Sequence, residues 1–222
     1  MTNEDPPPGP LRRGLRTGRL EAFSDGVFAI AITLLVLDIA VPASAEKHLL
    51  RSVADLWPSY LGYVTSVSTI GAIWLGHTVI TEYLELTDVG FVRLNLLLLL
   101  VIAFVPFPTK LFAEFIGEES PEHVAATIYG LSLLLASALL LVLWRYAVRH
   151  RLVRPDAADE EVQLLTKRLT PALAAYPVLI VTGLFTPAVA VIGYLGIALY
   201  DIIPFRGSGS IPFRRNRHLP RP

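Results

Sequence analysis

The chain has 222 residues, of which 53% are hydrophobic and only 17% are charged, whereas an ordinary soluble domain carries about 25% charged residues. Nineteen Lys and Arg residues balance nineteen Asp and Glu residues, so no basic surplus indicates nucleic acid as a partner. The absence of cysteine excludes disulfides, cysteine metal sites and thiol nucleophiles. The length is sufficient for about six membrane spans of roughly 20 residues each.

Stretches without Asp, Glu, Lys or Arg predict the membrane crossings, because one such charge at a helix centre costs about 2.5–3.5 kcal/mol. Four stretches have about the length of one span. The fifth, 169–200, holds 32 residues, and a helix of that length would extend about 48 Å across a core of roughly 30 Å. We expect Pro187 to divide it, because proline removes a backbone donor. The predicted spans are 20–41, 53–81, 90–109, 123–146, 167–185 and 188–203.

The positive charge of the predicted loops favours six spans over five. With six spans, sixteen of the nineteen Lys and Arg residues lie on the side of the two termini. Five spans would move the five C-terminal arginines to the other side, against the positive-inside rule. The sequence therefore predicts an all-α, polytopic cell-membrane protein with both termini cytoplasmic. Its membrane domain is 19–204, between a disordered Pro- and Arg-rich tail, 1–18, and a disordered basic tail, 205–222.

The first predicted helix carries the most informative pattern. At about 100° per residue, Ile30, Thr33, Leu34 and Leu37 form one stripe, and Asp25 lies on the far side. The stripe fits ordinary helix packing. It also fits the lining of an axis, where the Thr33 hydroxyl offers an oxygen to a passing cation and aliphatic side chains form a dry constriction. Asp25 is an ion site, a proton relay or a buried acid held by an internal partner, and its place opposite the stripe favours the last.

Several motifs along the chain resemble one family of membrane proteins. Arg19-x-x-x-Phe23-Ser24-Asp25-Gly26 opens the first span. The later motifs are Trp74-Leu-Gly-His77, Leu94-Asn95-Leu, Pro106-Phe-Pro-Thr109 and Leu143-Trp-Arg-Tyr146. In this order they resemble the transmembrane protein 175 family of potassium channels, in its bacterial single-repeat branch, over most of residues 19–150.

The resemblance implies six helices per chain and a homotetramer in which the first helix of each copy lines a central pore. Carried over by position, the hydrophobic constriction falls on Ile30 and the hydroxyl layer on Thr33, and Leu37 lies one turn further. The resemblance also implies a set of residues that support the pore, namely Arg19, Phe23, Ser24, Asp25, Gly26, Trp74, His77 and Asn95. The expected function is passive, selective conduction of K⁺, with K⁺ as the permeant ion and no cofactor.

Other functions compete with this one. The chain lacks the TVGYG filter of ordinary potassium channels, so selectivity is expected from dehydration at a ring of Ile30 side chains. A proton-permeable channel or a proton-coupled carrier is the alternative, because Asp25 and His77 are groups that relay protons. The sequence has no nucleophile elbow, P-loop or HExxH motif, so no enzyme is expected. The expected partners are K⁺, the lipid bilayer and further copies of the chain, without nucleic acid or any metal beyond permeating K⁺.

Overall fold

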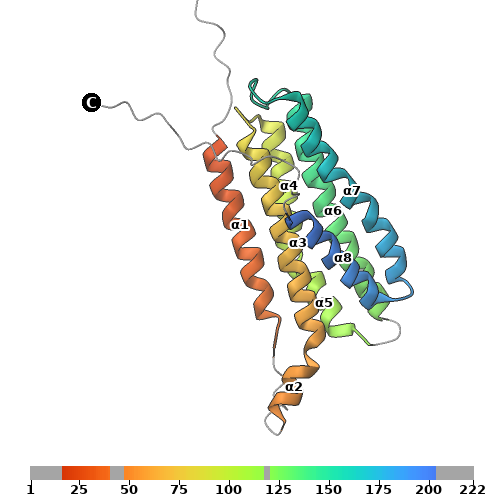
Figure 1. The fold of residues 1–222 in the computed structure, drawn as a ribbon. Helices are drawn as coiled ribbons and strands as arrows, with labels where there is room; N and C mark the ends of the chain where they lie inside the picture. Colours follow the sequence, from red (N-terminus) through yellow and green to blue (C-terminus); the bar gives the residue numbers. More distant parts are fainter. Residues whose placement is uncertain (1–16, 41–47, 118–120, 204–222) are drawn as a thin grey trace, which may run out of the picture.

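The computed structural model describes residues 17–40, 48–117 and 121–203. Within them the chain forms helices, and an isolated antiparallel bridge joins Leu84 to Val153. The helices are α1 (Thr17–Leu37), α2 (Leu49–Asp55), α3 (Trp57–Glu82), α4 (Val89–Phe104), α5 (Pro106–Phe115), α6 (Pro121–Arg149), α7 (Asp159–Gly183) and α8 (Pro187–Ile202). The long helices run side by side, with α1 at one edge of the bundle (Figure 1). The predicted tails lie outside the described residues, apart from Thr17 and Gly18.

Four helical segments are long and apolar enough to cross a membrane. They are Thr17–Leu37, Trp57–Glu82, Val89–Phe115 and Pro121–Arg149. Two shorter apolar helices, Leu173–Gly183 and Pro187–Ile202, lie where the last two spans are predicted. The chain is therefore a mostly helical protein with several membrane-crossing helices.

Some helices begin or end at other residues than the predicted spans, at places where charged residues or proline influence the helix end. α7 begins at Asp159 and not at 167, because acidic residues in a first turn are stabilised by the positive end of the helix dipole. The second predicted span divides into α2 and α3 at Leu56. Pro58 explains this break, because it has no N–H to continue the hydrogen bonds of α2.

The third predicted span, with an expected end at 109, continues to Phe115 as α5. Charged residues set the predicted end, but the helix extends beyond the uncharged stretch. The division expected at Pro187 falls between the end of α7 at Gly183 and the start of α8 at Pro187 itself.

α3 is the central helix, and it contacts α1, α5, α6 and α8. The largest fully buried side chains of the bundle include Ile70 on α3, Leu98 on α4, Trp144 on α6 and Tyr194 on α8. Lipid tails are as apolar as these side chains, so close packing and internal hydrogen bonds hold such helices together. Gly130 of α6 illustrates the packing, because a Cβ at that position would overlap the phenol of Tyr194 from α8.

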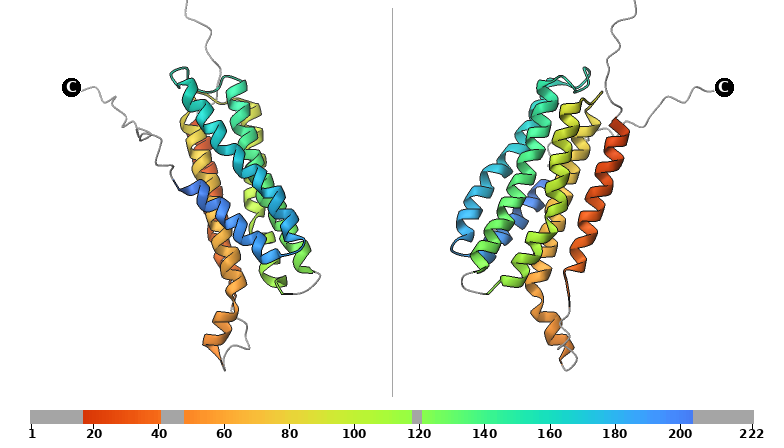
Figure 2. Two further views of the ribbon diagram at one scale, coloured as in Figure 1. Left: turned by 45° about the vertical axis from the view of Figure 1, so that its right-hand side comes forward. Right: turned by 180° about the vertical axis from the view of Figure 1, so that it is seen from behind.

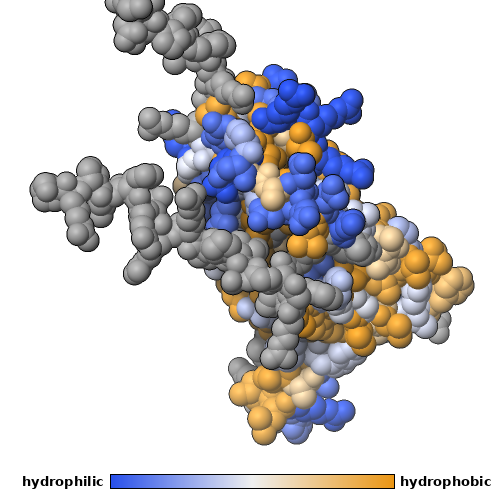
Figure 3. Space-filling model, turned by 45° about the horizontal axis from the view of Figure 1, so that its top comes forward, coloured by the Kyte–Doolittle hydropathy of each residue, from blue (hydrophilic) through white to orange (hydrophobic). Residues whose placement is uncertain are grey.

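The two ends of the bundle have different surfaces. Figure 2 shows α8 crossing one face of the bundle obliquely, and the α6–α7 loop at the end where α1 begins. Figure 3 shows hydrophilic residues gathered at that end, whereas hydrophobic residues dominate the lower part of the surface. This division is expected of a membrane protein, whose charged loops stay in water and whose flanks face lipid.

Candidate functional site

α1 has one buried face and one exposed face. Its buried residues are Ser24, Phe28, Ala31 and Leu35. The exposed face is rotated by roughly a third of a turn from the buried face. Its side chains are exposed by 57% at Phe23, 60% at Ile30, 44% at Leu34 and 72% at Leu37. We call Ile30, Thr33, Leu34 and Leu37 the α1 stripe. In a membrane protein, an exposed apolar helix face of this kind contacts lipid or another helix.

Thr33 is the polar member of the α1 stripe. It is exposed, and its hydroxyl donates to the carbonyl of Ile30 at 2.9 Å. This bond uses the only hydroxyl hydrogen but neither lone pair of the oxygen. The oxygen can therefore still accept a hydrogen bond or contact a cation. Gly26, on the same helix, has no atom within 4 Å of the place where a Cβ would lie.

Three buried polar side chains join α1, α4 and α3 behind the stripe. Asn95 Nδ2 donates to Ser24 Oγ at 3.0 Å, and Asn95 Oδ1 lies 2.8 Å from His77 Nε2. An amide oxygen only accepts, so His77 Nε2 carries the hydrogen of this bond. All three side chains are at most 1% exposed, and the ring of Phe28 lies 5.6 Å from that of His77. The network therefore fixes the buried face of α1 from two helices.

Asp25 makes a second connection between α1 and α3. Its carboxylate accepts a hydrogen bond of 2.9 Å from Trp74 Nε1. The acid has the internal partner expected from the sequence, but within the single chain it is exposed and not buried. Arg19, Phe23 and Gly26 are also exposed and take no part in these bonds. The structure thus brings together five of the eight residues predicted to support the pore.

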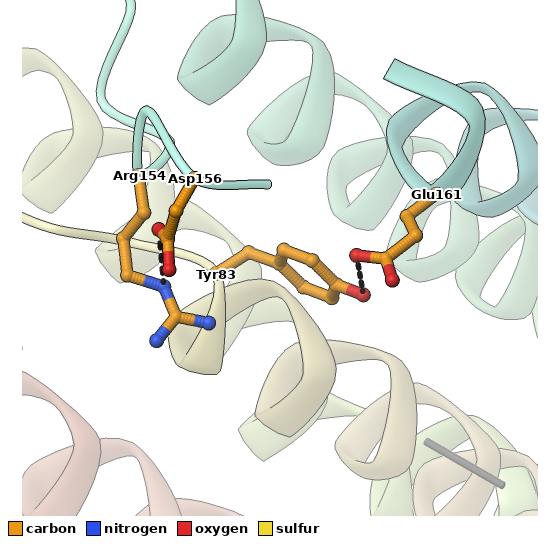
Figure 4. Close-up of polar contacts among 4 residues, drawn as sticks. All are labelled: Tyr83, Arg154, Asp156 and Glu161. Carbon is orange, nitrogen blue, oxygen red and sulfur yellow. Dashed lines mark hydrogen bonds and ion pairs between the residues drawn. The ribbon is translucent and has the colours of Figure 1, made fainter. Parts of the chain in front are cut away.

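A second polar cluster, which no sequence pattern indicates, joins the end of α3 to the α6–α7 loop and the first turn of α7 (Figure 4). We call Tyr83, Arg154, Asp156 and Glu161 the loop clasp. The Tyr83 hydroxyl donates to Glu161 at 3.1 Å, and Arg154 lies 6.0 Å from the Tyr83 ring and 4.0 Å from Asp156. The backbone N–H of Arg154 also donates to the backbone carbonyl of Tyr83 at 2.9 Å. Burial, followed by the bond to Glu161, raises the pKa of Tyr83 above its usual value of 10.0.

No group of three or more His, Asp or Glu side chains that could hold a metal ion occurs within residues 17–40, 48–117 and 121–203. The polar groups on α1 are instead hydroxyl and carboxylate groups, in pairwise contacts with amide, imidazole and indole groups of α3 and α4. This arrangement suits the positioning of a helix more than the tight chelation of an ion, which needs several ligands at once.

Membrane-length helices, and an edge helix that is braced on one face and apolar on the other, define a multi-pass α-helical membrane protein. Residues 19–106 match the family described as "Endosomal/lysosomal potassium channel TMEM175". All eleven predicted site residues fall within this range. A potassium channel of Chamaesiphon minutus is 44% identical over 156 residues, which are 68% of this chain and 76% of that protein. The chain belongs to the TMEM175 family, and the resemblance of its motifs is confirmed.

Two further comparisons describe the extent of the likeness. A potassium channel of Streptomyces collinus is 45% identical over 134 residues, which are 60% of this chain and 65% of that protein, slightly less than two thirds. The crystal structure of a lysosomal potassium-selective channel TMEM175 homolog from Chamaesiphon minutus matches with a TM-score of 0.75 and 38% identity. This match covers 83% of the chain and 95% of the solved one, so the fold is shared over almost the whole of the solved chain.

Proposed function

We propose that the chain is a potassium channel that conducts K⁺ passively through a pore lined by α1 from four copies. The observation that carries the proposal is the α1 stripe, whose side chains Ile30 and Leu37 are 60% and 72% exposed although they belong to a braced helix. The relatives from Streptomyces and Chamaesiphon are named potassium channels, and the solved homolog is called potassium-selective. These names support K⁺ as the permeant ion.

Assembly follows from the place of α1. Large aromatic side chains such as Trp144 and Tyr129 fill the interior of the single bundle, and α1 lies at its edge (Figure 1). An ion path is therefore better formed between copies than within one. Soluble and membrane homo-oligomers close by rotational symmetry, and four stripes facing one axis would bury their apolar side chains and enclose a narrow path.

Selectivity would arise at the narrowest ring of that path. A ring of Ile30 side chains offers no oxygen, so an ion must lose much of its water to pass. K⁺ holds its water less tightly than Na⁺ and loses less. The Thr33 oxygen, which keeps free lone pairs because its hydrogen is bonded to the Ile30 carbonyl, would offset part of this loss one turn further along α1.

The remaining features complete the proposed architecture. α7 and α8 are the fifth and sixth spans, which places both termini on the cytoplasmic side of the cell membrane, together with sixteen of the nineteen Lys and Arg residues. The Ser24–Asn95–His77 network and the Asp25–Trp74 bond hold α1 so that its stripe keeps facing the axis.

Substituted cysteines test the pore lining directly, because the chain has no cysteine of its own. A cationic thiol reagent should block Ile30→Cys and Leu37→Cys channels. Val178→Cys is the matched control, because Val178 is 66% exposed but lies on α7. Leu35→Cys, on the buried face of α1, is the second control. Block at Val178 as strong as at Ile30, or no block at either stripe position, would refute the pore assignment.

A proton-permeable channel or proton-coupled carrier is the second candidate, and His77 is the observation that favours it. Its imidazole is buried beside α1 and hydrogen-bonded to Asn95, and buried imidazoles in membrane proteins serve in proton relays. A pH gradient across a bilayer with equal K⁺ on both sides separates the two functions. A potassium pore gives a reversal potential near zero, whereas a proton path gives a reversal potential that follows the pH gradient.

A further inference from the structure

α4 and α5 are joined at a weakened point, although together they have the length of one membrane-crossing helix. Pro106 and Pro108 have no N–H, so they cannot donate to the carbonyls of Ile102 and Phe104, four residues earlier. The Ile102 carbonyl accepts the N–H of Val105 at 3.2 Å, three residues along. Loss of two donors within one turn makes Val105 the place where α5 can turn relative to α4.

A chain of three hydroxyls connects this joint to two other helices. Thr109 Oγ1 donates to the Val105 carbonyl at 2.8 Å, so it accepts the 2.7 Å bond from Ser66 Oγ. Ser66 has a single hydroxyl hydrogen, and the Tyr129 hydroxyl therefore donates to it at 2.7 Å. The donors run in one order, from Tyr129 on α6 through Ser66 on α3 to Thr109 and the Val105 carbonyl. We call Tyr129, Ser66 and Thr109 the hydroxyl chain.

The surroundings make the hydroxyl chain costly to break. Tyr129 and Ser66 are fully buried, and Thr109 is 4% exposed. Water therefore cannot reach these hydroxyls to replace a lost hydrogen-bond partner. The ring of Phe112, on α5, stacks on Tyr129 at 5.9 Å. Gly62 of α3 lets Thr109 approach closely, because a Cβ there would lie 3.3 Å from the Thr109 methyl group. The hydroxyl chain thus sets where α5 rests on α3 and α6.

α5 in turn lies beside the end of α1. A small hollow separates the two, and its lining comes from three elements. Leu35, Asp38 and Ile39 line it from the end of α1, Ser59 and Tyr63 from α3, and Thr109, Lys110 and Ala113 from α5. Thr109 is therefore both the last member of the hydroxyl chain and part of the wall that faces α1. A turn of α5 at Val105 changes this wall.

We infer that Val105 is a hinge and that the hydroxyl chain positions α5 as a support for the end of α1. The effect on conduction rests on the proposed function, in which α1 lines the pore. Tyr129, Ser66 and Thr109 are positioning residues, which act through α5 and do not touch the ion. Release of the hydroxyl chain lets α5 turn and changes the fraction of time for which the pore is open. It leaves ion preference unchanged, because the ring at Ile30 is not altered.

Hydrogen exchange of the full chain in lipid nanodiscs tests the hinge without any reference to conduction. Ser66→Ala removes two bonds of the hydroxyl chain and should speed exchange of the α5 amides about tenfold, and Tyr129→Phe, which removes one, should speed it about threefold. Ser132→Ala is the matched serine control, because Ser132 Oγ donates to the carbonyl of Ile128 on its own helix and so joins no second helix among the described residues. Tyr194→Phe is the matched tyrosine control, because the Tyr194 hydroxyl has no hydrogen-bond partner among the described residues.

The exchange rates decide the first part of the inference. Exchange in α5 that is the same in Ser66→Ala as in Ser132→Ala overturns the hinge. Where Ser66→Ala does not fold, Tyr129→Phe against Tyr194→Phe decides in its place, because loss of one hydroxyl leaves the ring stacking on Phe112 intact.

Single-channel recording of the same variants decides the second part. Ser66→Ala and Tyr129→Phe should change the open probability about threefold or more, with the reversal potential between K⁺ and Na⁺ unchanged and Ser132→Ala equal to the wild type. Faster exchange in α5 with an unchanged open probability refutes the support of α1 and keeps the hinge. A wild-type protein that carries no current refutes the proposed function, while the exchange rates still decide the hinge.

Discussion

The indole Nε1 of Trp74 donates a hydrogen bond of 2.9 Å to the carboxylate of Asp25 and so ties α3 to α1. The preceding residue of α1, Ser24, accepts a bond from Asn95 on α4. Two consecutive residues of an edge helix are thus held by two different neighbours. This arrangement fixes the rotation of α1 about its axis, and with it the direction in which the α1 stripe faces.

Removing the indole donor should loosen α1. Trp74→Phe is expected to lower the free energy of unfolding by about 1 kcal/mol, since a hydrogen bond to a charged acceptor is worth about 1.5–3 kcal/mol and this one is partly exposed. A double-mutant cycle with Asp25→Ala, which removes the acceptor, isolates the pair when measured by thermal unfolding in nanodiscs. Trp57→Phe, at the exposed start of α3, is the control. A coupling energy near zero would show that the bond does not contribute.

Asn95 is expected to be the most sensitive position of the buried network. In Asn95→Leu, Ser24 and His77 stay buried but each loses its hydrogen bond to the amide. The free energy of unfolding should fall by about 2–4 kcal/mol. Leu96→Ala is the neighbouring control, because Leu96 is 49% exposed on the outer side of α4. Unfolding in mixed micelles provides the comparison. Equal stability of the two variants would contradict a stabilising role for this network.

The features that recur at short sequence spacing can be predicted from the sequence. The α1 stripe follows from a helical period, and the break before α8 follows from Pro187. The motif residues Ser24, Asp25, Trp74, His77 and Asn95 are recognisable because they resemble a known family, and the structure brings their side chains together. Their spacing alone does not assign these pairs, because Ser24 and Asn95 lie 71 positions apart.

The features that depend on tertiary pairing are not visible in the sequence. Tyr83 and Arg154 of the loop clasp are adjacent in sequence to Leu84 and Val153, which form an antiparallel bridge, and no local pattern marks these segments as neighbours. The hydroxyl chain joins Ser66 to residues 43 and 63 positions further along. α7 begins at Asp159, before the predicted edge of the fifth span at 167, because charge marks the edge of a membrane span but not the end of a helix.

The loop clasp predicts a pH dependence. The pKa of Tyr83 is raised above 10.0, chiefly by burial and then by the bond to Glu161. Folding therefore favours the protonated phenol, so this contribution to stability is present below pH 10 and is lost as the pH rises through the folded pKa. Ionisation of tyrosine is followed by the absorbance of the phenolate as the pH rises. The titration curve of the wild type minus that of Tyr83→Phe should have its midpoint above pH 10. A midpoint at or below 10 would contradict the contact with Glu161, and Tyr60→Phe is the control.

The ring of Ile30 predicts a change in ion preference. Ile30→Asn places amide groups at the constriction, so ions keep more of their water and K⁺ loses its advantage. The preference for K⁺ over Na⁺ should fall about fivefold, the factor that corresponds to roughly 1 kcal/mol of lost discrimination. Val36→Asn, at a 49% exposed position of α1 outside the stripe, is the control. Unchanged reversal potentials in Ile30→Asn would contradict the assignment of the constriction.

The most direct test of the proposed function is a recording from the purified wild-type chain in a planar bilayer with K⁺ on one side and Na⁺ on the other. A pore built from α1 predicts discrete single-channel steps, because an open path passes many ions per opening. It also predicts a reversal potential displaced from zero in the direction set by a preference for K⁺. The absence of discrete steps, or a reversal potential at zero or on the Na⁺ side, would contradict a potassium-selective pore.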